Sequence, residues 1–365
     1  MSHLSDLAPY DAVLLLSFGA PEAPEEVLPF LRRVTAGAHI PDERLEQVGE
    51  HYYLFGGRSP INDQNRALIA ALRQELDARG VDAPIIWGNR FGEPFIDDAL
   101  REAHAAGHRR LVAVTTSAYS SYSSCRSYRE AIATQLAAVA DEGLELQIDK
   151  VAPYAPRPGF HEANLNRLVE TLRTLDGQPD DEVALLFVTH SIPRAMDDTS
   201  GPGDGEGSLY SQQHLALGAA LTEEANDTLG RHLTSELVFC SRSGPPQQPW
   251  LEPDINDRLA QLAADGIRTV VAAPIGFVSD HMEVVYDLDT EARATADRLG
   301  LAFVRVPTVG THDRFVADLA DALLERAAEA RSETVPTFEG RMPSVCAAGC
   351  CPNLRAARPA VCGRD

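Results

Sequence analysis

Residues 271–291 read VAAPIGFVSDHMEVVYDLDTE and predict a buried strand that runs directly into a helix. The helical part carries Glu283, Asp287 and Glu291, so an α-helix would stack the three carboxylates on one face over about 12 Å. Like charges at that spacing cost about 0.2 to 0.5 kcal/mol per pair, which favours a row along which cations or protons move. A solvated acidic face is the alternative interpretation. The place after a strand, where open α/β sheets bind ligands, supports the functional one.

Apolar runs of strand length alternate with amphipathic helical stretches along the whole chain. Near-continuous apolar strands separated by helices are typical of a parallel sheet that is covered on both faces. The predicted strands span residues 12–18, 83–89, 110–118, 182–190, 236–242 and 268–278.

The two halves of the chain resemble each other. GHRRLVAV at 107–114 corresponds to GIRTVVAA at 266–273, and aligning the halves sets Phe18 opposite His190. Two unrelated parallel strands can also produce matches this short. We expect an α/β fold of two similar, doubly wound, Rossmann-like parallel-sheet domains.

Three prolines interrupt the pattern in KVAPYAPRPGF and predict a domain boundary there. The predicted units are an N-terminal α/β domain at 1–150 and a C-terminal α/β domain with the metal site at 151–330. A short Cys-rich tail follows at 331–365. The chain of 365 residues is long enough for two domains that each have a core.

Composition excludes several partners. The chain has 32 basic and 54 acidic residues, a net charge of −22 and a pI of about 4.8. Nucleic acid and anionic membranes would be repelled at long range. The amino terminus lacks a signal peptide's basic region, and no apolar run reaches the length of a membrane span. We therefore expect a soluble cytoplasmic protein without integral membrane association.

His190 ends the predicted strand VALLFVTH. A histidine at the carboxyl end of a parallel strand points into the ligand crevice, where a neutral imidazole accepts a proton or binds a metal. A hydrogen-bonded structural role is the alternative. Facing Glu283 from the equivalent strand end of a two-domain cleft, His190 would serve as an acid/base or metal partner. No GxGxxG follows the first strand, and Walker A and GxSxG motifs are absent.

These motifs resemble those of the ferrochelatases, from about residue 10 to 325. The shared segments include LLLSFGAPE, YYLFGGRSPIN, GNRFGEPFIDDAL, THSIP, SRSGPPQQPWLEPD and GFVSDHMEVVYDLD. Among ferrochelatases the chain looks most like the soluble actinobacterial type, which acts on coproporphyrin III. The resemblance implies a chelatase-type fold with a porphyrin cleft between two domains.

The resemblance also implies roles for individual residues. His190 and Glu283 would be catalytic and face the porphyrin centre, and both would contact the metal. Asp287 and Glu291 would continue a route for metal or protons, with Asp289 nearby. The implied substrate-binding residues are Phe18, Tyr53, Ser59, Ser121 and Tyr122. Many related enzymes have tyrosine where this chain has Phe18, so we expect a hydrophobic porphyrin contact there instead of a metal ligand.

Four of the six cysteines lie in the tail, which is too short for a core of its own. This segment resembles that of the ferrochelatases that bind a 2Fe-2S cluster through one internal and three C-terminal cysteines. The resemblance implies the ligands Cys125, Cys346, Cys351 and Cys362, with Cys350 as the alternate to Cys351. The spacing differs from the animal type, and zinc, free thiols or disulfides remain alternatives.

The expected function is insertion of Fe(II), as substrate, into coproporphyrin III to form coproheme in haem biosynthesis. The same chemistry on protoporphyrin IX is a close alternative. A non-enzymatic haem-binding or redox-sensing protein, and insertion of cobalt or nickel into a corrin, are the others. The expected partners are porphyrin and ferrous iron, with transient contact to neighbouring haem-pathway enzymes.

Overall fold

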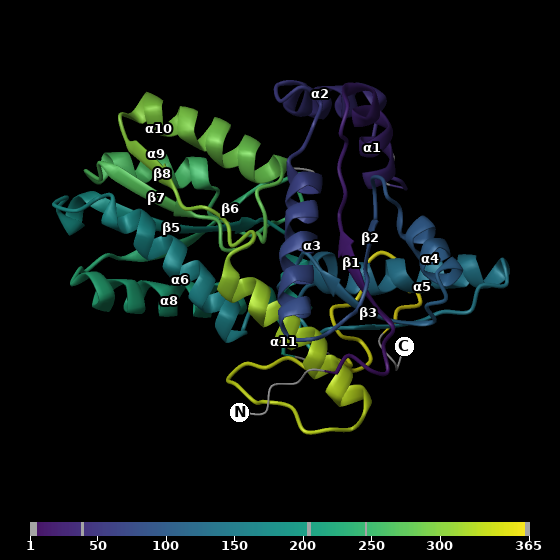
Figure 1. Ribbon diagram of the computed structural model, residues 1–365. Coiled ribbons are helices and arrows are strands. Elements are labelled where there is room, and N and C mark those ends of the chain that lie inside the picture. The colour runs from purple at the N-terminus through teal and green to yellow at the C-terminus, as the bar shows by residue number, and fades with distance from the viewer. Residues whose placement is uncertain (1–5, 38–39, 203–205, 245–246, 362–365) are drawn as a thin grey trace.

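The computed structural model describes residues 6–37, 40–202, 206–244 and 247–361. Figure 1 shows two α/β halves side by side, with helix α3 (Ile61–Ala78) between them. Cys362 lies outside the described residues, so its predicted role as a cluster ligand has no structural counterpart here.

The first half is a four-stranded parallel sheet in the order β2-β1-β3-β4. Its strands are β1 (Ala12–Ser17), β2 (Ile85–Asn89), β3 (Arg110–Thr115) and β4 (Gln147–Lys150). The other elements of this half are η1 (Pro24–Glu26), α1 (Val27–Val34), α2 (Asp42–Tyr53), α3, α4 (Ile96–Ala105), η2 (Tyr122–Arg126) and α5 (Ser127–Asp141).

The second half is a four-stranded parallel sheet in the order β6-β5-β7-β8. Its strands are β5 (Val183–His190), β6 (Ser235–Cys240), β7 (Thr269–Ala273) and β8 (Ala302–Arg305). Its helices are α6 (Pro158–Arg173), η3 (Asp180–Glu182), α7 (Arg194–Asp198), α8 (Leu209–Leu229), α9 (Ile255–Ala264), η4 (Val284–Ala292), α10 (Arg293–Leu299) and α11 (Asp313–Ala330).

The two sheets have the same strand order, which confirms the predicted doubly wound α/β architecture with a repeated half. The matched segments at 107–114 and 266–273 contain β3 and β7, which hold the same place in their sheets. The central strands are fully buried because helices cover both faces. The domain boundaries near 150 and 330 stay predictions.

We expected each half to have a separate hydrophobic core, but the structure differs from this expectation. One apolar cluster fills one face of the second sheet, and another fills one face of the first. The largest cluster includes residues of both halves, such as Leu72 and Val114 from the first and Phe187 and Leu323 from the second. Helix α11 also packs against both α6 and α3. The halves are therefore joined by a shared apolar core.

The acidic segment is a helix, as predicted, but it is a π-helix and not an α-helix. Residues Val284–Ala292 form a π-helix, as do Tyr122–Arg126 around Cys125. A π-helix pairs each N–H with the carbonyl five residues back, so each turn holds more residues than in an α-helix. Side chains four apart therefore still lie near one face of the helix, and the charges of Glu283 and Glu291 both raise the pKa of Asp287. Such bulges occur often at functional sites.

Candidate active site between the two halves

His190 is held at the end of β5 by hydrogen bonds on its main chain and ring. The Tyr210 hydroxyl donates to its carbonyl at 2.9 Å. The Nδ1–H donates to the carbonyl of Ser191. This hydrogen bond fixes the imidazole ring so that Nε2 faces Glu283, whose Oε1 lies 3.5 Å away.

Glu283 is the N-cap of the π-helix η4 and has a helical backbone conformation. Its main-chain N–H donates to His281 Nδ1 at 3.1 Å, and its Oε2 lies 3.9 Å from the same nitrogen. The side chains of His190 and Glu283 are 31% and 48% exposed, so both remain accessible to a ligand. The structure thus brings together the two residues predicted to be catalytic.

The pair is charged in the absence of substrate. Burial lowers the pKa of His190, but the carboxylate of Glu283 outweighs it and raises that pKa to about 9. Burial raises the pKa of Glu283, yet the charge of His190 lowers it to about 2. The resting state at neutral pH is therefore an imidazolium beside a carboxylate.

Asp287 lies behind this pair and receives a hydrogen bond from Ser241. Burial and the neighbouring charge of Glu283 raise the pKa of Asp287 to about 7, against the lowering effect of the Ser241 hydroxyl. Ser241 follows β6 and has a φ of 63°, a left-handed conformation uncommon outside glycine. Ser241 was not among the predicted site residues, although it belongs to the SRSGPP motif.

The other acidic residues of the π-helix differ from one another. Arg305 Nε donates to Asp289 at 2.7 Å, so this carboxylate is neutralised by an ion pair. Glu291 is exposed and hydrogen-bonds Tyr286, whose pKa rises through burial and the charge of Glu291. The predicted route from Glu283 through Asp287 to Glu291 thus ends at an exposed carboxylate.

Helix α2 of the first half faces η4 of the second. The rings of His51 and Tyr286 stack with centroids 3.8 Å apart. Burial, together with the charges of Glu283 and Asp287, raises the pKa of Tyr52, which places its ring close to the acidic pair. Tyr52 and its sequence neighbour Tyr53 were both candidates for lining the porphyrin cleft, and core packing was the alternative for each.

Phe18 follows β1, and its ring is 36% exposed. It packs against Phe91 at 4.7 Å and Phe30 at 6.2 Å between ring centroids. Tyr53 is more exposed, at 44%. These exposed aromatic faces suit contact with a flat apolar ring, as predicted for Phe18.

The three hydroxyl residues predicted to contact the substrate make hydrogen bonds within the protein, and their contact with substrate stays a prediction. Ser59 is buried, and its Oγ accepts from the N–H of Ile61 at 3.5 Å. Ser121 is buried at the start of η2, where its Oγ accepts from the N–H of Ser124. The Tyr122 hydroxyl donates to Glu130 at 3.2 Å and accepts from Asn353. None of these bonds joins the three residues to His190 or Glu283.

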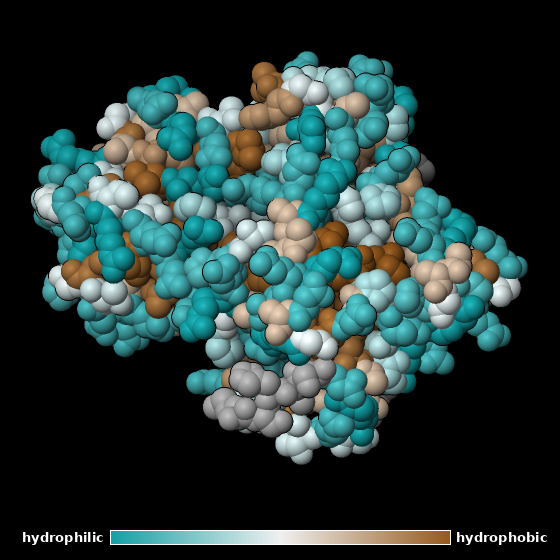
Figure 2. Space-filling view, viewed as in Figure 1, coloured by the Kyte–Doolittle hydropathy of each residue, from teal (hydrophilic) through white to brown (hydrophobic). Residues whose placement is uncertain are grey.

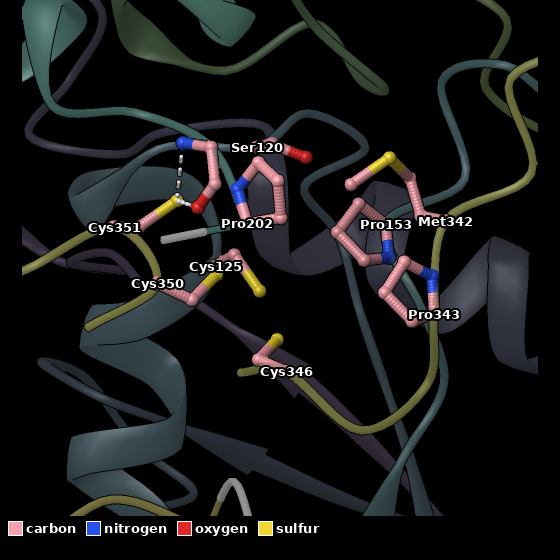
Figure 3. A pocket seen from close by; sticks show the side chains of 10 residues that line it. Ser120, Cys125, Pro153, Pro202, Met342, Pro343, Cys346, Cys350 and Cys351 are labelled. Atoms are coloured by element: carbon pink, nitrogen blue, oxygen red, sulfur yellow. Dashed lines mark hydrogen bonds between the residues drawn. The ribbon is translucent and has the colours of Figure 1, made fainter. Parts of the chain in front are cut away.

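Four cysteines line a small buried cavity where the tail meets the first half (Figure 3). They are Cys125, Cys346, Cys350 and Cys351. Hydrogen bonding with Cys346 and burial raise the pKa of Cys125 to about 12. Cys350 hydrogen-bonds both Cys346 and Cys351, and Cys351 Sγ also accepts from the N–H of Gly201 at 3.3 Å. The cavity volume is about 10 Å³, space for about one water molecule.

Within the described ranges, no three His, Cys, Asp or Glu side chains are grouped so that they could hold a single metal ion. No helix in that part of the chain is both long and apolar enough to cross a bilayer. The face shown in Figure 2 is mostly hydrophilic, in keeping with the net charge of −22.

The chain is similar in sequence to several bacterial proteins that share one name. Coproporphyrin III ferrochelatase of Streptomyces coelicolor is 50% identical over 372 residues, covering 100% of this chain and 99% of that protein. The Leifsonia xyli protein of the same name is 48% identical and covers 99% and 96%. Among solved structures, SirB from Bacillus subtilis with Fe3+ aligns with a TM-score of 0.48 and 12% identity, covering 88% of this chain and 98% of that one. The ferrochelatase family model matches residues 10–327. The chain therefore belongs to the ferrochelatase family.

Proposed function

We propose that this protein inserts ferrous iron into coproporphyrin III to form coproheme. The observation that carries the proposal is the ion pair of His190 and Glu283, which lies at the start of the acidic helix η4 and close enough to Tyr52 of the first half to raise its pKa. The similarity to enzymes named for this reaction, at 43–50% identity over nearly the whole chain, supports the choice of porphyrin.

Iron insertion releases two pyrrole protons and strips water from the metal. Glu283 is ionised at neutral pH, so it can accept a proton or attract Fe(II). His190 becomes an acceptor once its Nε2 proton leaves, and an approaching dication favours that loss by repulsion. Imidazole suits Fe(II), a metal of intermediate softness.

Asp287 provides the next step for protons. With a pKa of about 7, it takes up and releases a proton with equal ease at neutral pH. A proton accepted at Glu283 can pass toward Asp287 and leave at the exposed Glu291. We propose that these four residues act as catalytic and metal-handling groups, and Phe18 and Tyr53 as porphyrin contacts.

The test is anaerobic insertion of Fe(II), followed by absorbance, with coproporphyrin III and protoporphyrin IX compared side by side. Faster turnover of coproporphyrin supports the proposal. Preference for protoporphyrin would make the enzyme a protoporphyrin ferrochelatase. Tight haem binding without turnover of either porphyrin would instead support the non-enzymatic alternative.

We further propose that the tail cysteines hold a 2Fe-2S cluster. The fit rests on donor chemistry: four thiols from η2 and the tail converge in one buried cavity. Cys346 contacts Cys125 and Cys350, and Cys350 contacts Cys351, so the proposed ligands stay Cys125, Cys346, Cys351 and Cys362, with Cys350 as the alternate to Cys351. Because the cavity is small, the thiols must separate to admit a cluster. Bound there, it would tie the tail to the first half.

Iron and acid-labile sulfide, measured in anaerobically purified protein, test the cluster. Cys346→Ser should lose both, whereas Cys240→Ala, which removes a buried cysteine of β6, should retain them. Zinc in place of sulfide would favour the mononuclear alternative. A cytoplasmic location and contacts with neighbouring haem-pathway enzymes stay predictions.

A further inference from the structure

Lys150 is the only lysine in the chain, where every other basic side chain is an arginine. It is the last residue of β4, and it is only 2% exposed. Its Nζ donates to Cys125 Sγ at 3.8 Å and to the carbonyl of Val151 at 3.2 Å. The amine of Lys150 therefore contacts one of the proposed cluster ligands, where burial lowers its pKa and the charge of Cys125 raises it.

The surroundings of Lys150 supply no carboxylate partner. None of its hydrogen bonds within the described ranges goes to an Asp or Glu, and it forms no ion pair there. The groups that can carry negative charge beside it are the thiols of Cys125 and Cys346. Lysine is almost never fully buried unless it is paired, because an isolated buried charge is costly.

A second cation fixes the tail against the same place. Arg129, on α5, is buried and interacts electrostatically with Lys150. Its guanidinium donates to the carbonyls of Ser344 at 3.1 Å and Val361 at 2.9 Å. Ser344 precedes Cys346 by two residues, and Val361 directly precedes Cys362 in sequence. Positive side chains of the first half thus meet the tail close to Cys346.

We infer that Lys150 is the charge partner of the tail cluster and raises its reduction potential. The inference rests on the proposed 2Fe-2S cluster. A cluster bound by four thiolates carries net negative charge, and one-electron reduction adds another negative charge. A fixed ammonium against Cys125 stabilises the reduced form more than the oxidised form.

A purely structural role makes a different prediction. If Lys150 only braces the Val151 carbonyl, neutral substitution would lower the stability of the fold and leave the cluster's potential unchanged. The potential is therefore the deciding measurement, since packing alone does not move it in a consistent direction.

The experiment uses the anaerobically purified full-length protein with its cluster. The midpoint potential is measured by titration with dithionite and redox mediators, followed by electron paramagnetic resonance. The variants are Lys150→Met, which removes the charge, and Lys150→Arg, which keeps it. Arg268→Met is the control, because this arginine is 73% exposed and lies on the other half.

We expect a more negative midpoint for Lys150→Met and near-wild-type values for Lys150→Arg and Arg268→Met. If Lys150→Met loses its cluster during purification, Lys150→Gln, which can still donate to the Val151 carbonyl, is measured instead and should show the same negative shift. An unchanged midpoint in a cluster-loaded neutral variant overturns the inference alone. Wild-type protein without iron and sulfide overturns the cluster proposal as well.

Discussion

The side-chain amide of Gln64 makes two hydrogen bonds to the main chain of Asp280. Its Oε1 accepts from the Asp280 N–H at 2.9 Å, and its Nε2 donates to the Asp280 carbonyl at 2.8 Å. Gln64 lies on α3 of the first half, whereas Asp280 lies three residues before Glu283. The side chain of Asp280 is also held by Arg305 at 3.0 Å. One glutamine of the first half thus holds the segment of the second half that precedes His281 and Glu283.

Replacing Gln64 with alanine should lower kcat for iron insertion by roughly tenfold to a hundredfold, since a shift of about 1 Å in a catalytic group can cost that much. The segment would lose both main-chain hydrogen bonds while the catalytic side chains stay intact. Steady-state kinetics test this, with circular dichroism to verify folding. Gln261→Ala, on helix α9, removes a surface glutamine and should keep wild-type kcat. A normal kcat in Gln64→Ala would show that the segment holds its position without this contact.

His190→Ala should lower kcat/KM for insertion by on the order of 10² to 10⁴, the usual contribution of a general acid or base. The variant loses the acceptor at Nε2, and it leaves Glu283 without the charge that lowers its pKa. His232→Ala, an exposed histidine after α8, is the matched control. Porphyrin affinity, measured by fluorescence quenching, should change little. A large loss of affinity would assign His190 to binding instead of chemistry.

The sequence predicts much of this architecture, but it does not predict the edge strands of the sheets or the contacts between the two halves. The central strands are unbroken apolar runs, so their pattern is unambiguous. Strands β4 (QIDK) and β8 (AFVR) were missed, because sheet edges are short and need not be wholly apolar. Both lie at the end of their sheets, where one side has no neighbouring strand.

The functional site likewise contains residues that the sequence predicts and contacts that it does not. His190 and Glu283 were predicted from strand ends and motifs, and the structure places them 3.5 Å apart. Gln64 could not be predicted, since its partner is 216 residues away and is a main-chain group that every residue has. The π-helical geometry around Asp287 also leaves no periodic signal, because an extra residue in one turn looks like an ordinary helix in sequence.

Asp287 should make stability depend on pH below neutrality. Its pKa is raised from 3.8 to about 7, so the fold favours its neutral form. That contribution is complete below pH 3.8 and is lost as pH rises through 7. Asp287→Asn cannot ionise, so its Tm relative to wild type should rise between pH 4 and 7 and then level off. Asp265→Asn, at an exposed carboxylate after α9, should show a constant difference. Parallel Tm curves for Asp287→Asn and wild type would contradict the raised pKa.

Glu325 ties the start of the tail to the second half. This buried carboxylate on α11 accepts from both ends of the Arg157 guanidinium, at 2.8 and 3.1 Å, and from Arg341 at 2.6 Å. Glu325→Gln leaves two arginines without their shared anion. Because breaking a buried ion pair costs about 3 to 5 kcal/mol, the free energy of unfolding in urea should fall by roughly that amount.

The same substitution should expose the tail to protease, because Arg341 loses its strongest contact with α11. Trypsin should then cut Glu325→Gln faster than wild type after Arg331 or Arg341. The control is Glu329→Gln, which removes only the more accessible partner of Arg341, at 2.9 Å, and leaves Arg157 paired. It should cost under about 1 kcal/mol, as partly exposed pairs do. Equal losses in the two variants would mean that the tail is held by Arg341 alone, and that the Arg157 contact contributes nothing to its docking.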